Sequence, residues 1–240
     1  MISTDEYFGF ILPVIITYFN NKKINNIIEF GNSTWGNGWT NGAGKYGLLS
    51  RGKTPSDHPI SFWKHNNIQY VPIDISGINS ISLDLGKELP ESIENINIKN
   101  NFDIMLDIGT IEHVKNQYEV WKNCHDVVKK EGLMLHSLPL VGWWKNHCYH
   151  WYTMNFFKQL AKKCNYEIIM LTEEKACREN FKENPDYQIL VAYVKREENN
   201  FIEKEVFENI FLESKCETNF FVNKAHGIPN YDIKIHGENV

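Results

Sequence analysis

The sequence predicts an α/β fold in which helices cover a mostly parallel β-sheet. From Ile24 onward, short apolar runs alternate with segments of helical periodicity, a pattern typical of such sheets. The last two apolar runs follow one another without a long helix between them, so we expect them to form an antiparallel pair at a sheet edge. A chain of 240 residues is long enough to bury one large core of this kind.

Seven apolar runs are interpreted as the strands of this sheet. They span residues 24–31, 68–76, 80–85, 102–109, 132–139, 166–172 and 187–195. The first run ends in a glycine turn at Gly31, and the second carries Asp74 near its end. The last two runs are the expected antiparallel edge pair.

Four segments are predicted to be helical: residues 7–19, 112–130, 153–163 and 201–212. In the second of them, Thr110 is the expected N-cap and Gly132 the expected stop signal. Thr153 is the expected N-cap of the third. The simplest organisation is a single domain over residues 1–198, with an insertion at about 36–67 and a C-terminal extension over 199–240.

Composition narrows the classes of partner and compartment. A net charge of −5 and an isoelectric point near 6.0 provide no basic surface for nucleic acid, so no nucleic-acid partner is expected. The apolar run 7–19 is too short to cross a bilayer and contains a proline, so no membrane association is expected. Five scattered cysteines without a CxxC pair indicate free thiols and a cytoplasmic location. The sequence leaves the oligomeric state open, a dimer included.

The glycine-rich stretch from Glu29 to Gly47 admits three interpretations as a nucleotide loop. A phosphate-binding GxxxxGK[ST] loop fails because Trp39 stands at the first glycine and Tyr46 replaces the magnesium-binding hydroxyl. A dinucleotide GxGxxG match at residues 42–47 lies well beyond the end of the first strand, where that motif does not function.

The third interpretation rests on several motifs in a fixed order. An acid and a glycine, Glu29 and Gly31, follow the first strand, with Ser33 and Trp35 at the later positions of an E/DxGxGxG pattern. An acid, Asp74, ends the second strand, where a carboxylate can accept both ribose hydroxyls of a nucleoside. Another, in "SLDL", follows the third strand.

The stretch "FDIMLDIGTIEHV", residues 102–114, carries most of the likeness to a known family. After it come a glycine-led strand that ends in proline, a histidine-bearing loop and the helix "YTMNFFKQL". In this order the motifs resemble the class I S-adenosylmethionine-dependent methyltransferases. The resemblance covers roughly residues 24–195.

The resemblance implies a Rossmann-like three-layer sandwich with a seven-stranded sheet in the order 3-2-1-4-5-7-6. It also implies S-adenosyl-L-methionine as the cofactor and methyl transfer to a small-molecule acceptor, such as the hydroxyl of a saccharide or secondary metabolite. By position in the motifs, the cofactor-binding residues are Glu29, Gly31, Asn32, Ser33, Asp74, Ile75, Asp84, Leu85, Asp107, Ile108 and Gly109. Ser33 and Trp35 depart from the glycine pattern, which keeps open an alternative: a non-catalytic binding or assembly subunit with this fold. A dinucleotide-dependent oxidoreductase is a more distant alternative.

Two histidines are the candidate catalytic residues, because histidine is the usual general base near neutral pH. His113 follows the fourth strand, and His150 lies in the loop "NHCYHWYT" after the fifth; each has the alternative of a purely structural role. A metal site of His147, Cys148 and His150 lacks further ligands. The Glu112–His113 pair resembles a pair that can hold a divalent metal in members of the family related to ubiquinone synthesis. A further upstream acid of that pattern is replaced here by Gly109. No metal is therefore expected.

Overall fold

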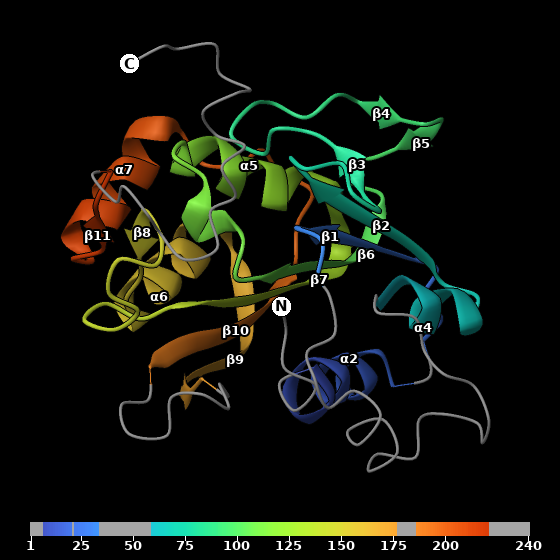
Figure 1. Ribbon diagram of the computed structural model, residues 1–240, viewed down its shortest axis with the longest axis horizontal. Helices are drawn as coiled ribbons and strands as arrows, with labels where there is room; N and C mark the ends of the chain where they lie inside the picture. Colours follow the sequence, from blue (N-terminus) through green and yellow to red (C-terminus); the bar gives the residue numbers. More distant parts are fainter. Residues whose placement is uncertain (1–6, 21, 34–58, 177–185, 221–240) are drawn as a thin grey trace.

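The computed structural model describes residues 7–20, 22–33, 59–176 and 186–220 (Figure 1). Its helical elements are η1 (Tyr7–Ile11), α2 (Leu12–Phe19), α4 (Pro59–His65), η2 (Ile111–His113), α5 (Gln117–Val127), α6 (Met154–Cys164) and α7 (Lys204–Glu213). The strands of the main sheet are β1 (Asn26–Phe30), β2 (Gln69–Asp74), β3 (Ile81–Ser82), β6 (Phe102–Ile108), β7 (Val128–Pro139), β9 (Tyr166–Lys175) and β10 (Tyr187–Lys195). Two small antiparallel pairs lie outside it: β4 (Ser92–Ile93) with β5 (Ile96–Asn97), and β8 (His150–Trp151) with β11 (Glu217–Thr218).

The main sheet has seven strands in the order β3-β2-β1-β6-β7-β10-β9. Counted along the chain within this sheet, the order is 3-2-1-4-5-7-6, as the family resemblance implies. Within this sheet, the strands β3, β2, β1, β6 and β7 are parallel to one another, and β10 runs antiparallel to both of its neighbours, β7 and β9. The predicted α/β class, the mostly parallel sheet and the antiparallel edge pair are confirmed.

Helices cover both faces of the sheet, because the central strands send apolar side chains alternately to each side. On one face Ile28 and Met105 pack with α5, α6 and α7, whereas on the other Ile27 and Ile104 pack with α2 and α4 (Figure 1). This alternation produces two separate cores and hence the three-layer sandwich. The carboxyl ends of β1, β2, β6 and β7 consequently lie along one edge of the sheet.

The predicted helix over 112–130 is wrong at both ends. Residues 111–113 form a single 3₁₀ turn, and α5 begins only at Gln117, where the side chain of Asn116 accepts a hydrogen bond from the Glu119 amide. Thr110 makes no capping hydrogen bond. At the other end, β7 begins at Val128, so the residues expected to close the helix belong to a strand.

Two of the predicted helices are present, and other sequence expectations concern the insertion, the cysteines and membrane-spanning segments. The helix expected over 7–19 is present as η1 and α2, and α6 is capped by the Thr153 hydroxyl, as predicted. Most of the predicted insertion, along with the GxGxxG match at 42–47, lies outside the described residues; its last part contains α4. Of the cysteines, the four that the structure describes are unpaired thiols. No helix among the described residues is both long and apolar enough to span a membrane.

Gly132 is required by close packing within β7. A Cβ at this position would lie 2.5 Å from Cγ1 of Val128 and 2.8 Å from the carbonyl oxygen of Lys129. Real Cβ atoms do not approach backbone so closely, so Gly132→Ala must displace the strand. We expect the variant to lose about 1–3 kcal/mol of unfolding free energy in urea denaturation.

Gly142→Ala is the comparison for this prediction. Gly142 has a φ of +89°, but a Cβ added to it would meet no atom within 4 Å, so its alanine variant carries backbone strain without a clash. A Gly132→Ala protein as stable as the wild type would contradict the packing argument.

Candidate functional site

The candidate site lies at the carboxyl edge of the sheet, where its strand order reverses direction. Chain connections leave β1 toward β2 on one side and later return to β6 on the other side of β1. Open α/β sheets bind ligands in the crevice outside the carboxyl ends at such a switch point. The turns after β1 and β6 are therefore the two segments that frame the site.

The turn after β1 and the turn after β6 contact each other at Gly31. Gly31, directly after β1, has a φ of +106° and donates its N–H to the carbonyl oxygen of Ile73 over 2.7 Å. A Cβ on Gly31 would overlap Oγ1 of Thr110, which follows β6. Gly109, beside it, has a φ of +72° and is exposed. Glycine is needed at Gly31 for both conformation and space.

Glu29, the predicted acid of the first loop, is a buried group held by a neighbour on β2. Its side chain is 1% exposed, and Oε2 accepts a hydrogen bond from the Tyr70 hydroxyl. Oε1 has no hydrogen-bond partner. Burial raises the pKa of Glu29 to about 7, against the opposing effect of hydrogen bonding.

The rest of the first loop reaches toward the loop after β2. The side-chain amide of Asn32 donates to the carbonyl oxygen of Ile78, and Ser33 is buried. Asp74 stands at the end of β2, half-buried, and its Oδ1 accepts the N–H of Ser76 over 2.7 Å. The second carboxylate oxygen of Asp74 makes none of the hydrogen bonds recorded for the described residues, and Ile75 beside it is half-buried.

Asp84 and Leu85 lie past the end of the short β3 rather than within a strand. Asp84 accepts the N–H of Gly86 over 2.9 Å and pairs with Lys87 at 3.4 Å. The side chain of Leu85 is 5% exposed and belongs to the core under α5. Of these two predicted residues, Asp84 is the one whose side chain remains accessible.

Both carboxylate oxygens of Asp107 have partners inside the protein. Its Oδ1 accepts the backbone N–H groups of Thr110 and Ile111, and its Oδ2 lies 2.9 Å from Nδ1 of His136. The carboxyl group is fully buried, so it shapes the turn after β6 instead of presenting a free oxygen. Ile108 and Gly109 are the accessible members of this predicted trio.

The two candidate catalytic histidines are both held neutral by burial. His113, on η2, has a pKa lowered to about 3 by burial and by the nearby His147 and His150. His150, on β8, is 3% exposed, and burial lowers its pKa to about 4. Nδ1 of His150 lies 3.0 Å from the Thr218 hydroxyl, whereas its Nε2 has no partner.

Two further polar residues of this region, Glu112 and His147, were considered in the sequence as parts of separate metal sites and set aside. Glu112 is 2% exposed, and its pKa is raised well above the usual value by burial and by Asp107. His147 lies with its ring centroid 4.9 Å from that of His113. An acid beside a histidine in "TIEHV" was visible in the sequence, but its burial and the arrival of His147 were not.

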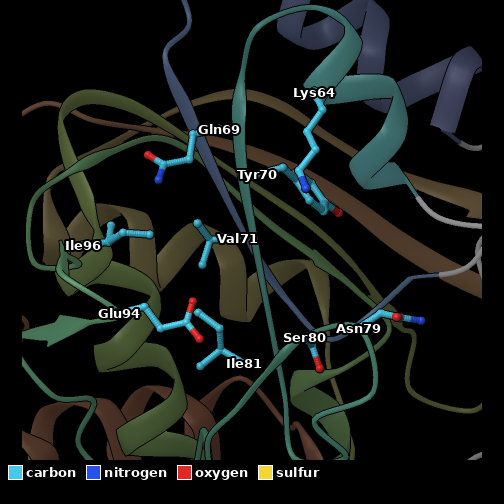
Figure 2. Close-up of a pocket in the computed structure, with 9 residues that line it drawn as sticks. All are labelled: Lys64, Gln69, Tyr70, Val71, Asn79, Ser80, Ile81, Glu94 and Ile96. Carbon is cyan, nitrogen blue, oxygen red and sulfur yellow. The ribbon is translucent and has the colours of Figure 1, made fainter.

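A cavity of about 370 Å³ lies elsewhere, along the outer edge of the sheet. Its lining residues include 69–71 of β2, at the opposite end of the strand from Asp74, and 79–81 from the loop after β2 and the start of β3; Figure 2 shows Lys64 beside Tyr70. The cavity therefore borders the loop after β2 but does not include Asp74. Tyr70 belongs to both regions, because its hydroxyl bonds Glu29.

The chain has only distant likenesses to known proteins. No protein-family model and no curated protein sequence matches the chain. Among solved structures, the chain is similar to the 1,6-didemethyltoxoflavin-N1-methyltransferase of Burkholderia thailandensis, crystallised with S-adenosylhomocysteine, at 10% identity and a TM-score of 0.48 over 81% of this chain and 80% of that one. The [4+2]-cyclase SpnF is similar at 12% identity and 0.47, over 78% and 80%. The DszA carbon methyltransferase is similar at 12% and 0.44, over 81% and 55%.

At these identities, and with TM-scores below 0.5, the likenesses carry no argument about chemistry. The fold itself rests on the sheet. Its strand order, with β10 antiparallel to both neighbours, is the order that the family resemblance implies. The reaction must be argued from the site.

Proposed function

We propose that this protein transfers a methyl group from S-adenosyl-L-methionine to a small-molecule acceptor at the carboxyl edge of the sheet. The observation that carries the proposal is the contact of the Gly31 turn with the turn after β6 at the switch point. Gly31 and Gly109 have positive φ and carry no side chain, which leaves the backbone of both turns open to close approach by a nucleoside.

In the proposed complex, Asp74 accepts hydrogen bonds from the ribose hydroxyls. One of its oxygens holds the Ser76 amide, which fixes the direction of the carboxylate. Asp84 lies next along the edge and is the candidate partner for the adenine side of the donor. The backbone at Gly31 and Gly109 faces the methionine portion.

Methyl transfer to a hydroxyl is an in-line displacement. The acceptor oxygen forms a bond to the methyl carbon as the carbon–sulfur bond breaks, S-adenosylhomocysteine leaves as a neutral thioether, and the hydroxyl proton passes to a base. Alignment of donor and acceptor supplies much of the rate enhancement. His113 and His150 are the candidate bases, since a neutral imidazole can take up this proton.

The proposal predicts that S-adenosylmethionine and S-adenosylhomocysteine bind with micromolar affinity and that Asp74→Ala weakens binding about tenfold to a hundredfold. Loss of charge-assisted hydrogen bonds of this kind costs roughly 1.5–3 kcal/mol. Isothermal titration calorimetry measures both. Glu208→Ala, on the exposed side of α7, is the control and should bind as the wild type does.

The alternative function, a non-catalytic binding or assembly subunit, is favoured by Asp107, because both of its carboxylate oxygens are engaged in hydrogen bonds inside the protein. It predicts no binding at millimolar donor. That result would overturn the methyltransferase proposal.

A further inference from the structure

Three potential metal ligands from two separate segments converge beside the candidate site. Glu112 and His113 come from η2, and His147 comes from the loop after β7. One ligand atom from each lies within 4.8 Å of the other two. Nε2 of His113 is 3.7 Å from Oε1 of Glu112, close to the roughly 3.4 Å that separates two donors bound at about 2.1 Å in a tetrahedral site.

Backbone contacts hold the two segments together. The Tyr149 amide donates to the carbonyl oxygen of Glu112 over 3.1 Å, and the His147 amide donates to that of Trp144. Trp144 is anchored in turn by its own amide to Asp186 and by its indole N–H to the Tyr187 carbonyl oxygen. These hydrogen bonds therefore hold His147 next to η2 even when no ligand is bound.

The carboxyl group in this cluster is buried and only partly hydrogen-bonded. The Glu112 side chain is 2% exposed, and its Oε2 has no hydrogen-bond partner. Its Oε1 lies 3.7 Å from Nε2 of His113. A cation at this position would favour the ionised carboxylate, which burial otherwise disfavours.

The neighbouring residues His147, Cys148 and His150 do not form a metal site together. Cys148 donates its S–H to the carbonyl oxygen of His150 over 3.1 Å, and Nδ1 of His150 lies near the Thr218 hydroxyl. His147 instead turns to His113, with the two rings edge to face at 74°. The fold thus separates neighbours in the sequence and joins residues that are distant in it.

The donor atoms select the class of metal. Two imidazole nitrogens and one carboxylate oxygen suit zinc and the other divalent first-row transition metals, whereas magnesium and calcium prefer sites made of oxygen alone. We propose that Glu112, His113 and His147 form a binding site for a divalent transition-metal ion such as Zn²⁺. Three protein ligands leave coordination positions open, which is typical of catalytic rather than structural sites.

The position of this site gives it a role at the acceptor, and that role rests on the proposed function. A Cβ on Gly109 would lie 3.4 Å from Oε1 of Glu112, so the metal ligands adjoin the turn assigned to the donor. A metal there would bind an acceptor oxygen and lower the pKa of its hydroxyl. The ion would hold the nucleophile beside the methyl group. Because the imidazole of a metal-bound His113 cannot accept the hydroxyl proton, His150 would then be the remaining candidate base.

The test uses the full chain, stripped of metal by a chelator and dialysed. Zn²⁺, Co²⁺ and Mg²⁺ are each titrated by calorimetry, and the visible absorption of Co²⁺ reports its coordination. We expect one equivalent of Zn²⁺ or Co²⁺ per chain and at least tenfold weaker binding of Mg²⁺. Glu112→Gln and His147→Ala should each weaken Zn²⁺ binding at least tenfold, whereas His65→Ala, an exposed histidine on α4, should not.

His147→Ala keeps the test valid if Glu112→Gln misfolds, since His147 is half-buried on a loop. Equal Zn²⁺ affinity and stoichiometry in wild type and His147→Ala would overturn the proposal, as would wild type that binds Zn²⁺ no better than Mg²⁺. Donor titration in the presence of chelator separates the two proposals. Failure there with Zn²⁺ binding intact overturns methyl transfer alone, and the reverse overturns the metal site alone.

Discussion

Lys195→Met is expected to lower the free energy of unfolding by about 3 kcal/mol or more. Lys195 ends β10 with 1% of its surface exposed, and its Nζ donates to three oxygens at 2.8–2.9 Å. They belong to the Asn100 side chain and the carbonyl groups of His125 and Val128. Methionine has a similar length but no donor, so the two buried carbonyl groups lose a partner, each at about 1–3 kcal/mol, and the exposed Asn100 side chain loses one that water can replace.

These acceptors explain why one side chain matters so much. The carbonyl groups lie at and just beyond the end of α5, where helical carbonyls have no partner within the helix. Lys195 thus satisfies the carbonyl groups at the end of α5 from β10. Burial of the ammonium lowers the pKa of Lys195 to about 8, so its attachment also weakens in alkaline solution.

Urea denaturation at pH 7 measures the effect, with Lys204→Met as the matched control. Lys204 lies on α7, is 63% exposed, and pairs with Glu208 at 3.7 Å. Exposed pairs of this kind contribute little, so the control should change stability by less than about 0.5 kcal/mol. Equal effects of the two substitutions would refute the assigned role of Lys195.

Glu29→Gln is expected to remove a pH dependence of stability. Glu29 titrates near 7 in the folded protein and near 4.5 when unfolded. Between these values the folded state retains a proton that the unfolded state releases, so stability falls as pH rises through 4.5–7 and then levels off. Full ionisation costs the wild type about 3 kcal/mol relative to a group that stays neutral.

Glutamine preserves the shape and can still accept the Tyr70 hydroxyl proton. Relative to wild type, Glu29→Gln should therefore gain stability progressively from pH 4.5 to 7.5, which urea denaturation at several pH values can follow. Tyr70→Phe is the second variant. It removes one of the hydrogen-bond donors that favour the carboxylate, the other being Ser33, so the pKa of Glu29 should rise further. A difference between wild type and Glu29→Gln that does not vary with pH would disprove this account.

The fold was largely predictable because its signals are local. Apolar runs of strand length identified all seven strands of the main sheet, and the Thr153 hydroxyl marked the start of α6. The boundary between α5 and β7 was not predictable. Lys129 and Lys130 are good helix-ending residues, but Lys129 forms an ion pair with the buried Asp103 and β7 pairs with β6 from Val128. Strand pairing overrode the local preference.

Some residues of the candidate site could be predicted from the sequence, and others could not. Gly31, Asp74 and Asp84 follow strands whose direction the sequence predicts, so their place at one edge of the sheet follows from topology. Asp107 could not be assigned from its motif, because only the tertiary structure shows His136 occupying it.

By itself, the sequence determined the class of fold, its strand order through a family resemblance, and the row of acids and glycines at the carboxyl edge. Hydrophobic periodicity and turn residues act over a few positions, and these features need no more. The tertiary structure alone decided that Glu29 and Lys195 are buried with specific partners and that His147 meets Glu112 and His113. Burial and convergence depend on how distant segments pack, and no local pattern of residues encodes them.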